Sequence, residues 1–176
     1  MAHIHLIEGP VGAGKSTFGA QLSRQLKAPQ LVVDDWMATL FAPDRPDSDT
    51  IAWYLERKDR CIEQIWTITC GLMEVGIDAV LELGLIQSAS RQLFYERMDA
   101  AEYPFTVHVI EASREVRRAR VRARNKTRGA TYSMDVPDGF FELASDMWQR
   151  PGDEECVGRD IQFVSSKSEA PPAEIR

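Results

Sequence analysis

The chain has 176 residues, which suits a single domain; we assign residues 1–165 to it and expect residues 166–176 to form a flexible tail. Hydrophobic residues make up 44% and charged residues 27%, as in globular proteins, and no run approaches the roughly 20 apolar residues of a membrane span. The net charge of −6 disfavours nucleic acid as a partner, and three widely spaced cysteines argue against a disulfide framework or a zinc site.

Strand and helix signals alternate from the N-terminus, which carries no secretion signal, so we expect a cytoplasmic protein. Residues 3–8 predict a first strand. Residues 16–27 predict a helix, because Phe18, Leu22 and Leu26 recur every four residues and form one buried face.

Further apolar runs and helical patterns alternate along the rest of the chain. We expect strands at 31–33, 77–83, 105–110 and 161–164, and helices at 50–75, 88–102, 114–128 and 139–149. Continuously apolar strands separated by helices are typical of a parallel sheet that is covered on both faces. The sequence therefore predicts an α/β fold with three layers and a parallel sheet of about five strands.

A phosphate-binding loop follows the first strand. Residues 9–16 match G-x-x-x-x-G-K-[ST] at every fixed position, between a strand and a helix as the motif requires. Glycines let the backbone N–H groups turn toward phosphate oxygens, and the next helix directs its N-terminal dipole at the same place. The residues expected to bind nucleotide here are Gly9, Pro10, Val11, Gly12, Ala13, Gly14, Lys15, Ser16 and Thr17.

The nucleotide is expected to be ATP with Mg²⁺. A GTPase needs N-K-x-D to read guanine, whereas the nearest segment, residues 125–128, ends in arginine. Lys15 is expected to reach the β- and γ-phosphates as a catalytic residue, and the Ser16 hydroxyl to coordinate Mg²⁺.

Three acids follow predicted strands. Asp34 and Asp35 come at the carboxyl end of the second strand, the edge that faces the ligand crevice in open α/β sheets. We assign the base that accepts the proton of an attacking hydroxyl to Asp34 and the cap of the next helix to Asp35; capping by both is the alternative. Glu82 ends the third strand, where it can hold Mg²⁺ through water or, alternatively, pair with a buried cation.

The helix predicted at 114–128 concentrates basic charge. It carries eight arginines and lysines and a single acid, Glu115. Arg117, Arg120 and Arg124 share one helical face, and we expect this face to neutralise the transferring phosphoryl as part of an arginine-rich lid. The alternative is a solvated basic helix.

Several segments resemble the small zeta-toxin-like or polynucleotide-kinase-like P-loop kinases, a group also described as AAA family ATP-binding proteins. The segments are GPVGAGKST, LVVDDW, LELGL, RVRARNKTRGATYSMDVPDGFF and PGDEE, in the order seen in that group. The resemblance implies a doubly wound parallel sheet, Mg-ATP binding, Asp34 as the base that activates the acceptor, and Arg120, Arg124 and Arg128 as lid arginines that contact the nucleotide.

The sequence departs from the polynucleotide kinases at one position. Those kinases carry an arginine two residues beyond the Asp pair to hold the phosphate of the substrate, and here that position is Met37. We therefore expect an ATP-dependent kinase that phosphorylates a hydroxyl of a small molecule. The alternatives are a polynucleotide 5′-hydroxyl kinase and an ATP-binding regulatory switch without an acceptor.

Overall fold

A parallel five-stranded sheet forms the centre of the computed structural model, which describes residues 1–129, 132 and 135–166. The strands lie in the order β2-β3-β1-β4-β5, and every neighbouring pair is parallel. Their bounds are β1 Ile4–Glu8, β2 Gln30–Val32, β3 Ala79–Glu82, β4 Phe105–Glu111 and β5 Ile161–Ser165. This arrangement confirms the predicted α/β fold, with β1 in the central position.

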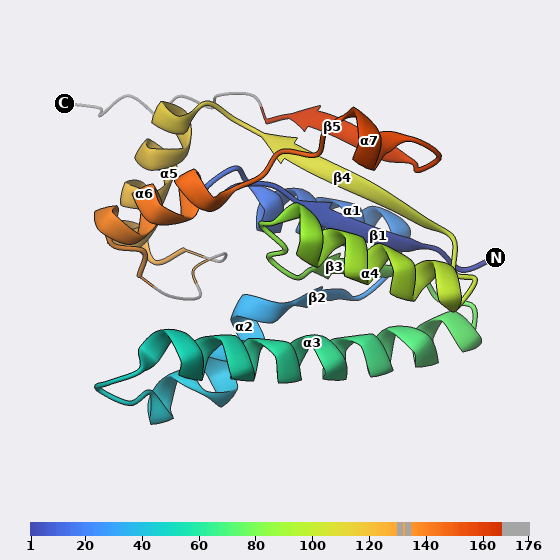
Figure 1. Cartoon of the computed structure of the whole chain (residues 1–176), viewed down its shortest axis with the longest axis horizontal. Helices are drawn as coiled ribbons and strands as arrows, with labels where there is room; N and C mark the ends of the chain where they lie inside the picture. Colours follow the sequence, from blue (N-terminus) through green and yellow to red (C-terminus); the bar gives the residue numbers. More distant parts are fainter. Residues whose placement is uncertain (130–131, 133–134, 167–176) are drawn as a thin grey trace.

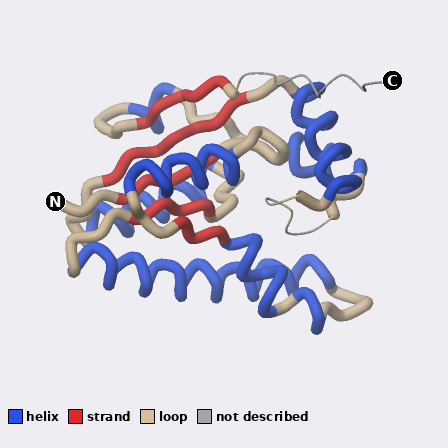
Figure 2. The backbone as a smooth tube through the Cα atoms, turned by 180° about the vertical axis from the view of Figure 1, so that it is seen from behind, coloured by secondary structure: helices blue, strands red, loops and turns tan. Residues whose placement is uncertain are grey.

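Helices cover both faces of the sheet. In chain order they are α1 Lys15–Leu26, α2 Val33–Leu40, the 3₁₀ turn η1 Ala42–Asp44, α3 Thr50–Glu74, α4 Ser88–Ala100, α5 Arg114–Thr127, α6 Asp138–Met147 and α7 Asp153–Cys156. Figure 2 shows the long helix α3 running along one side of the sheet, and Figure 1 places α5 and α6 at the end of the sheet opposite the N-terminus. The carboxyl ends of the strands therefore lie between α2 on one side and α5 on the other.

The alternation of side chains along β1 separates two apolar clusters. Ile4 and Leu6 pack with Ile65 of α3 and Phe94 of α4 in the larger cluster, and Ile7 packs with Phe18 of α1 on the opposite face. Because both faces of the strand are buried, a charged residue at its end is forced into the protein interior. This matters for Glu8, described below.

Two local expectations differ from the structure. Asp34 and Asp35 lie in the first turn of α2 and not at the end of the strand, because helix α2 begins directly after Val32. The prediction of Asp35 as the N-cap is wrong, because Val32 occupies that position and makes no side-chain cap hydrogen bond. Both acids instead add negative charge to the N-terminal turn, where the helix dipole favours it.

The short helix α7, which the sequence analysis missed, is held by a buried ion pair. Arg91 of α4 is fully buried and donates to both carboxylate oxygens of Glu155, at 2.6 and 2.8 Å. Ser88 and Tyr95 donate to the same carboxylate, so each charge is well satisfied. The PGDEE segment is thereby fixed against α4. Beyond β5, Ser166 is still tied to Glu111, while residues 167–176 of the predicted tail lie outside the described residues.

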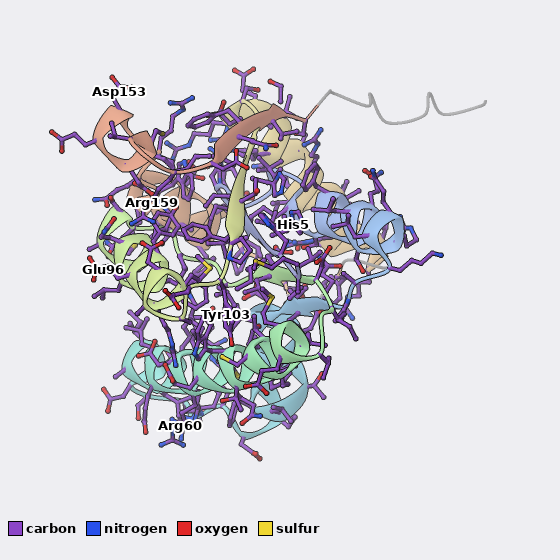
Figure 3. The ribbon with its side chains drawn as sticks, turned by 90° about the vertical axis from the view of Figure 1, so that its right-hand side faces the viewer. His5, Arg60, Glu96, Tyr103, Asp153 and Arg159 are labelled. Carbon is purple, nitrogen blue, oxygen red and sulfur yellow. The ribbon has the colours of Figure 1, made fainter. Side chains whose placement is uncertain are left out.

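A histidine pair lies between the neighbouring strands β1 and β4, next to Phe18 of α1. The ring of His5, labelled in Figure 3, stacks on His108 of β4, and His5 Nδ1 lies 3.1 Å from His108 Nε2. Burial lowers the pKa of both imidazoles, that of His108 to about 4 from 6.5. The two rings therefore share a hydrogen bond in their neutral forms.

This pair predicts a loss of stability in mild acid. The unfolded chain binds a proton at His108 near pH 6.5, whereas the folded chain binds it only near pH 4, so the stability contributed by the neutral ring falls as the pH drops through this window. When the pH is lowered from 7.5 to 5, we expect the melting temperature of His108→Gln to fall less than that of the parent chain. Thermal unfolding of the two proteins at both pH values measures this, and equal losses would contradict it.

Candidate active site

The glycine loop after β1 is closely packed against β4 and α5. Gly9 has φ +146°, and a Cβ there would lie 2.5 Å from the Ile110 carbonyl oxygen. Gly12 has φ +77°, and its Cβ would lie 2.7 Å from the carbonyl oxygen of Arg117. Only glycine fits both the backbone conformation and the space at these positions. The glycines therefore let the loop pack closely against the backbone of β4 and α5.

Lys15, Ser16 and Glu82 lie where the motif predicts them, at the start of α1 and the end of β3. Lys15 Nζ donates to the Pro10 carbonyl oxygen at 3.2 Å, so the lysine folds back over its own loop. Ser16 Oγ donates to Glu82 Oε1 at 3.1 Å. Thr17, the last residue of the predicted nucleotide site, is exposed one position further along α1.

The second carboxylate oxygen of Glu82 fits a metal site. Oε2 is buried and has no hydrogen-bond partner among the described residues, and burial raises the pKa of the carboxyl group. A hydroxyl and a carboxylate side by side are hard oxygen ligands of the kind that Mg²⁺ takes, either directly or through water. The structure thus supports the fit of Mg²⁺ to Ser16 and Glu82. The alternative was that Glu82 pairs with a buried cation. No ion pair among the described residues includes Glu82.

One face of α5 contacts the glycine loop. Arg117 Nη1 donates to the Val11 carbonyl oxygen at 3.0 Å, and Arg120 Nη1 donates to that of Ala13 at 3.1 Å. Arg124 lies one turn further along this face, half-buried, and its Nε has no hydrogen-bond partner among the described residues. The three arginines expected on one face therefore do lie along it, with two of them on the loop.

The opposite face of α5 is neutralised by α6. Arg114 and Arg118 pair with Glu142, and Arg122 pairs with Asp138. These arginines stay partly exposed to solvent, but they are directed at α6, whose acids lie at matching intervals. Ion pairs between α5 and α6 thus neutralise part of the positive charge that the sequence concentrates in α5. Arg128, the third predicted lid arginine, is exposed and pairs with Asp135 at 3.3 Å.

The comparisons with known proteins bear on this geometry. Residues 4–149 match the model of the AAA_33 family, described as an AAA domain. The chain belongs to this AAA domain family. No curated protein sequence matches the chain. The described residues of this AAA domain include no helix with the length and apolar character to cross a membrane.

Solved structures share the fold of this AAA domain at low sequence identity. A putative kinase from Chloroflexus aurantiacus has a TM-score of 0.69 at 16% identity, covering 93% of this chain and 85% of its own. A sugar kinase from Janibacter has a TM-score of 0.60 at 11% identity, covering 94% and 85%. The Pnkp1/Rnl/Hen1 RNA repair complex gives 0.63 at 17%, covering 83% of this chain and 43% of the other. These neighbours share the fold that the resemblance to small P-loop kinases implies.

Two charged residues of this AAA domain escaped the sequence analysis. Glu8, the last residue of β1, is fully buried, and neither carboxylate oxygen has a hydrogen-bond partner among the described residues. Lys58 of α3 is half-buried and donates from Nζ to the Gly84 carbonyl oxygen at 2.7 Å. Both had a signal in the sequence. Glu8 is an acid at the end of an apolar strand directly before the loop, and Lys58 lies on the helical face of Tyr54, Cys61 and Ile65.

The buried carboxyl group of Glu8 predicts an unusual pH dependence of stability. Burial raises its pKa from 4.5 to about 8, although the nearby charge of Lys15 opposes the shift. The folded chain therefore holds a proton that the unfolded chain has released, and this contribution to stability is lost as the pH rises toward 8. We expect Glu8→Gln to be more stable than the parent chain at pH 8.5 and to lose that advantage at pH 5.

Thermal unfolding of the nucleotide-free proteins at the two pH values tests this expectation. Glu111→Gln serves as the matched control, because Glu111 also ends a strand but is only half-buried and pairs with Arg150 at 2.6 Å. A Glu8→Gln protein that is less stable than the parent at pH 8.5 would show that the buried carboxylate is satisfied and ionised.

Proposed function

We propose that the protein is a kinase that transfers the γ-phosphate of Mg-ATP to a hydroxyl of a small-molecule acceptor. One observation carries the proposal: Lys15, the Ser16–Glu82 pair and the inner arginines of α5 surround the same glycine loop. Cations on two sides of a phosphate position are what phosphoryl transfer requires, since charge spreads over the transferring group. The fold likeness to a putative kinase and a sugar kinase supports the same reaction class.

The acceptor side is assigned to the edge of the sheet next to α2. Asp34 is exposed in the first turn of α2, so its carboxylate is accessible to an incoming hydroxyl. It accepts the hydroxyl proton while the acceptor oxygen forms a bond to the γ-phosphorus and the bond to the β,γ-bridging oxygen breaks. The leaving ADP keeps that electron pair, and its charge is neutralised by Lys15.

The lid side is assigned to α5. Arg120 reaches the loop at Ala13, and the unpartnered Nε of Arg124 lies on the same helical face. Guanidinium groups suit the equatorial oxygens of the transferring phosphoryl group, because their N–H donors fork. Ser16 and Glu82 would hold Mg²⁺, which when bound screens the negative charge of the phosphates.

A polynucleotide 5′-hydroxyl kinase is the second candidate, supported by the fold likeness to the RNA repair complex. Met37 weighs against it. This side chain is only 2% exposed and contacts Cys61 inside the core, so the position that would carry a phosphate-binding arginine does not reach the acceptor edge. We therefore rank a small acceptor first.

Transfer of label from γ-labelled ATP tests the proposal. The protein is incubated with Mg²⁺ and with nucleosides, sugars, sugar acids and 5′-hydroxyl oligonucleotides as acceptors. Label on a small acceptor supports the proposal, and label on the oligonucleotide alone moves the assignment to the second candidate. Release of phosphate that no acceptor accelerates would instead indicate a regulatory ATPase.

A further inference from the structure

Lys58 is the charged residue that α3 directs toward the carboxyl end of β3. Its Nζ donates to the Gly84 carbonyl oxygen, two residues beyond Glu82, at 2.7 Å. Gly84 has φ +62°, and a Cβ there would lie 3.5 Å from Lys58 Nζ, so the lysine packs directly on this glycine. The LELGL segment noted in the sequence thus forms the surface on which the Lys58 ammonium group lies.

The ammonium group of Lys58 retains unused donors. It can donate three hydrogen bonds, and the structure shows one. Among the ion pairs of the described residues, none includes Lys58. Lys58 is half-buried, and burial lowers its pKa although the charges of Asp34, Glu8 and Asp59 oppose the shift, so its charge is partly shielded from water with no carboxylate in an ion pair with it. An ammonium group in that state favours an anionic oxygen ligand.

Lys58 and the proposed base belong to the same edge of the sheet. Val32 of β2 pairs in register with Glu82 of β3, and Asp34 and Gly84, the residue that Lys58 bonds, each follow two residues later. The charges of Asp34 and of the buried Glu8 act on Lys58, in keeping with this placement. An acceptor whose hydroxyl meets Asp34 would therefore present its neighbouring substituents at the edge of the sheet where Lys58 lies.

The other cations of this part of α3 point elsewhere. Arg57 lies over the Trp53 ring and pairs with Glu56. Arg60, labelled in Figure 3, projects from the outer surface of α3 and also pairs with Glu56. Met37 is enclosed in the core. Of these three cations of α3, Lys58 is thus the one that lies at the carboxyl end of β3.

We propose that Lys58 binds an anionic group, a carboxylate or a phosphate, carried by the acceptor next to the hydroxyl that is phosphorylated. This inference rests on the proposed function, whose acceptor it narrows to hydroxy acids or phosphorylated alcohols. Lys58 acts as a specificity residue: it orients the acceptor so that the hydroxyl meets Asp34, and it rejects neutral analogues by leaving its own buried charge unpaired.

Binding of matched probes to the Mg-ADP complex tests the inference without requiring turnover. The probes are D-gluconate with its neutral twin D-glucitol, and adenosine 3′-phosphate with its neutral twin adenosine. Calorimetry should show tighter binding of at least one anionic probe than of its twin. The gluconate and adenosine arms distinguish a carboxylate from a phosphate as the natural group.

Three variants separate recognition from structure. We expect Lys58→Met to weaken the anionic probe by roughly 10- to 100-fold, the range of a charged hydrogen bond, and to leave the neutral twin and Mg-ADP unchanged. Lys58→Arg should restore part of the loss, and Arg60→Met, two residues along the same helix, should change nothing. A loss of Mg-ADP affinity in Lys58→Met would instead assign Lys58 to the nucleotide or to the fold and overturn the inference.

The remaining outcomes are also decisive. Equal binding of anionic and neutral probes, binding of neutral probes alone, or no binding of any probe overturns the anion site. Label transfer from ATP, measured in the same samples, keeps the proposed function separate. Transfer to an anionic acceptor that is unaffected in Lys58→Met retains the kinase and removes the inference. Binding of an anionic probe that depends on Lys58, without transfer to any acceptor, retains the anion site and removes the kinase.

Discussion

Replacing Lys15 by alanine should abolish measurable binding of Mg-ATP, with a loss in affinity of at least about 100-fold. The Lys15 ammonium group is the cation at the start of α1, and among the described residues its hydrogen bond goes to a backbone carbonyl of its own loop, so it is available to the β- and γ-phosphates. Two charged hydrogen bonds to phosphate are each worth about 1.5–3 kcal/mol, and their sum exceeds the energy of a 100-fold change. Calorimetric titration with Mg-ATP measures the loss.

Arg24→Ala is the matched control for Lys15. Arg24 is an exposed cation on the last turn of the same helix, so its removal changes the net charge equally without touching the loop. We expect its affinity for Mg-ATP to stay within about twofold, as is usual for an exposed charge remote from the ligand. Similar losses in both variants would indicate that the nucleotide responds to net charge and not to the loop lysine.

Replacing Asp34 by asparagine should lower phosphate transfer by roughly 10²- to 10⁴-fold, the contribution of a general base. Asparagine keeps the shape of the side chain and removes its ability to take the hydroxyl proton. Affinity for Mg-ATP should remain within about twofold, because Asp34 lies on α2, across from the loop and from the arginines of α5. Initial rates of label transfer and calorimetric titration give the two quantities.

Asp35→Asn controls for the charge of the helix terminus. Both acids lie in the first turn of α2, where each stabilises the helix by about 0.3–1 kcal/mol through its dipole. The two variants therefore share any loss of helix stability, and only the base should lose transfer. A larger loss of transfer in Asp35→Asn than in Asp34→Asn would assign the base to Asp35. Full activity of both variants would contradict a mechanism in which either carboxylate acts as the base.

The order of the elements and the phosphate loop could be predicted because their signals are local. Apolar runs of strand length, helical spacing and glycines at fixed intervals each depend on neighbouring residues alone, and the structure confirms the resulting parallel sheet. The position of Glu82 also followed, since parallel strands end at one edge. The predicted place of Asp34 at the end of a strand was wrong, because α2 follows β2 without a loop and Asp34 lies in its first turn.

The arginines show where local reasoning stops. Helical spacing divides Arg117, Arg120 and Arg124 from the other face of α5, and this division is correct. It does not say that α6 supplies acids to Arg118 and Arg122. Charge pairing between two helices depends on their packing, so the same basic run could equally have faced solvent.

By itself the sequence determined that this protein has a phosphate-loop motif on a parallel sheet, with Glu82 at the end of a strand and a basic helix further along the chain. The tertiary structure alone decided which charges are buried and which are neutralised. Glu8 is enclosed because β1 is the central strand, and Lys58 turns inward because α3 packs its face against the sheet edge. Burial and pairing arise from contacts between residues far apart in the chain, which no local pattern encodes.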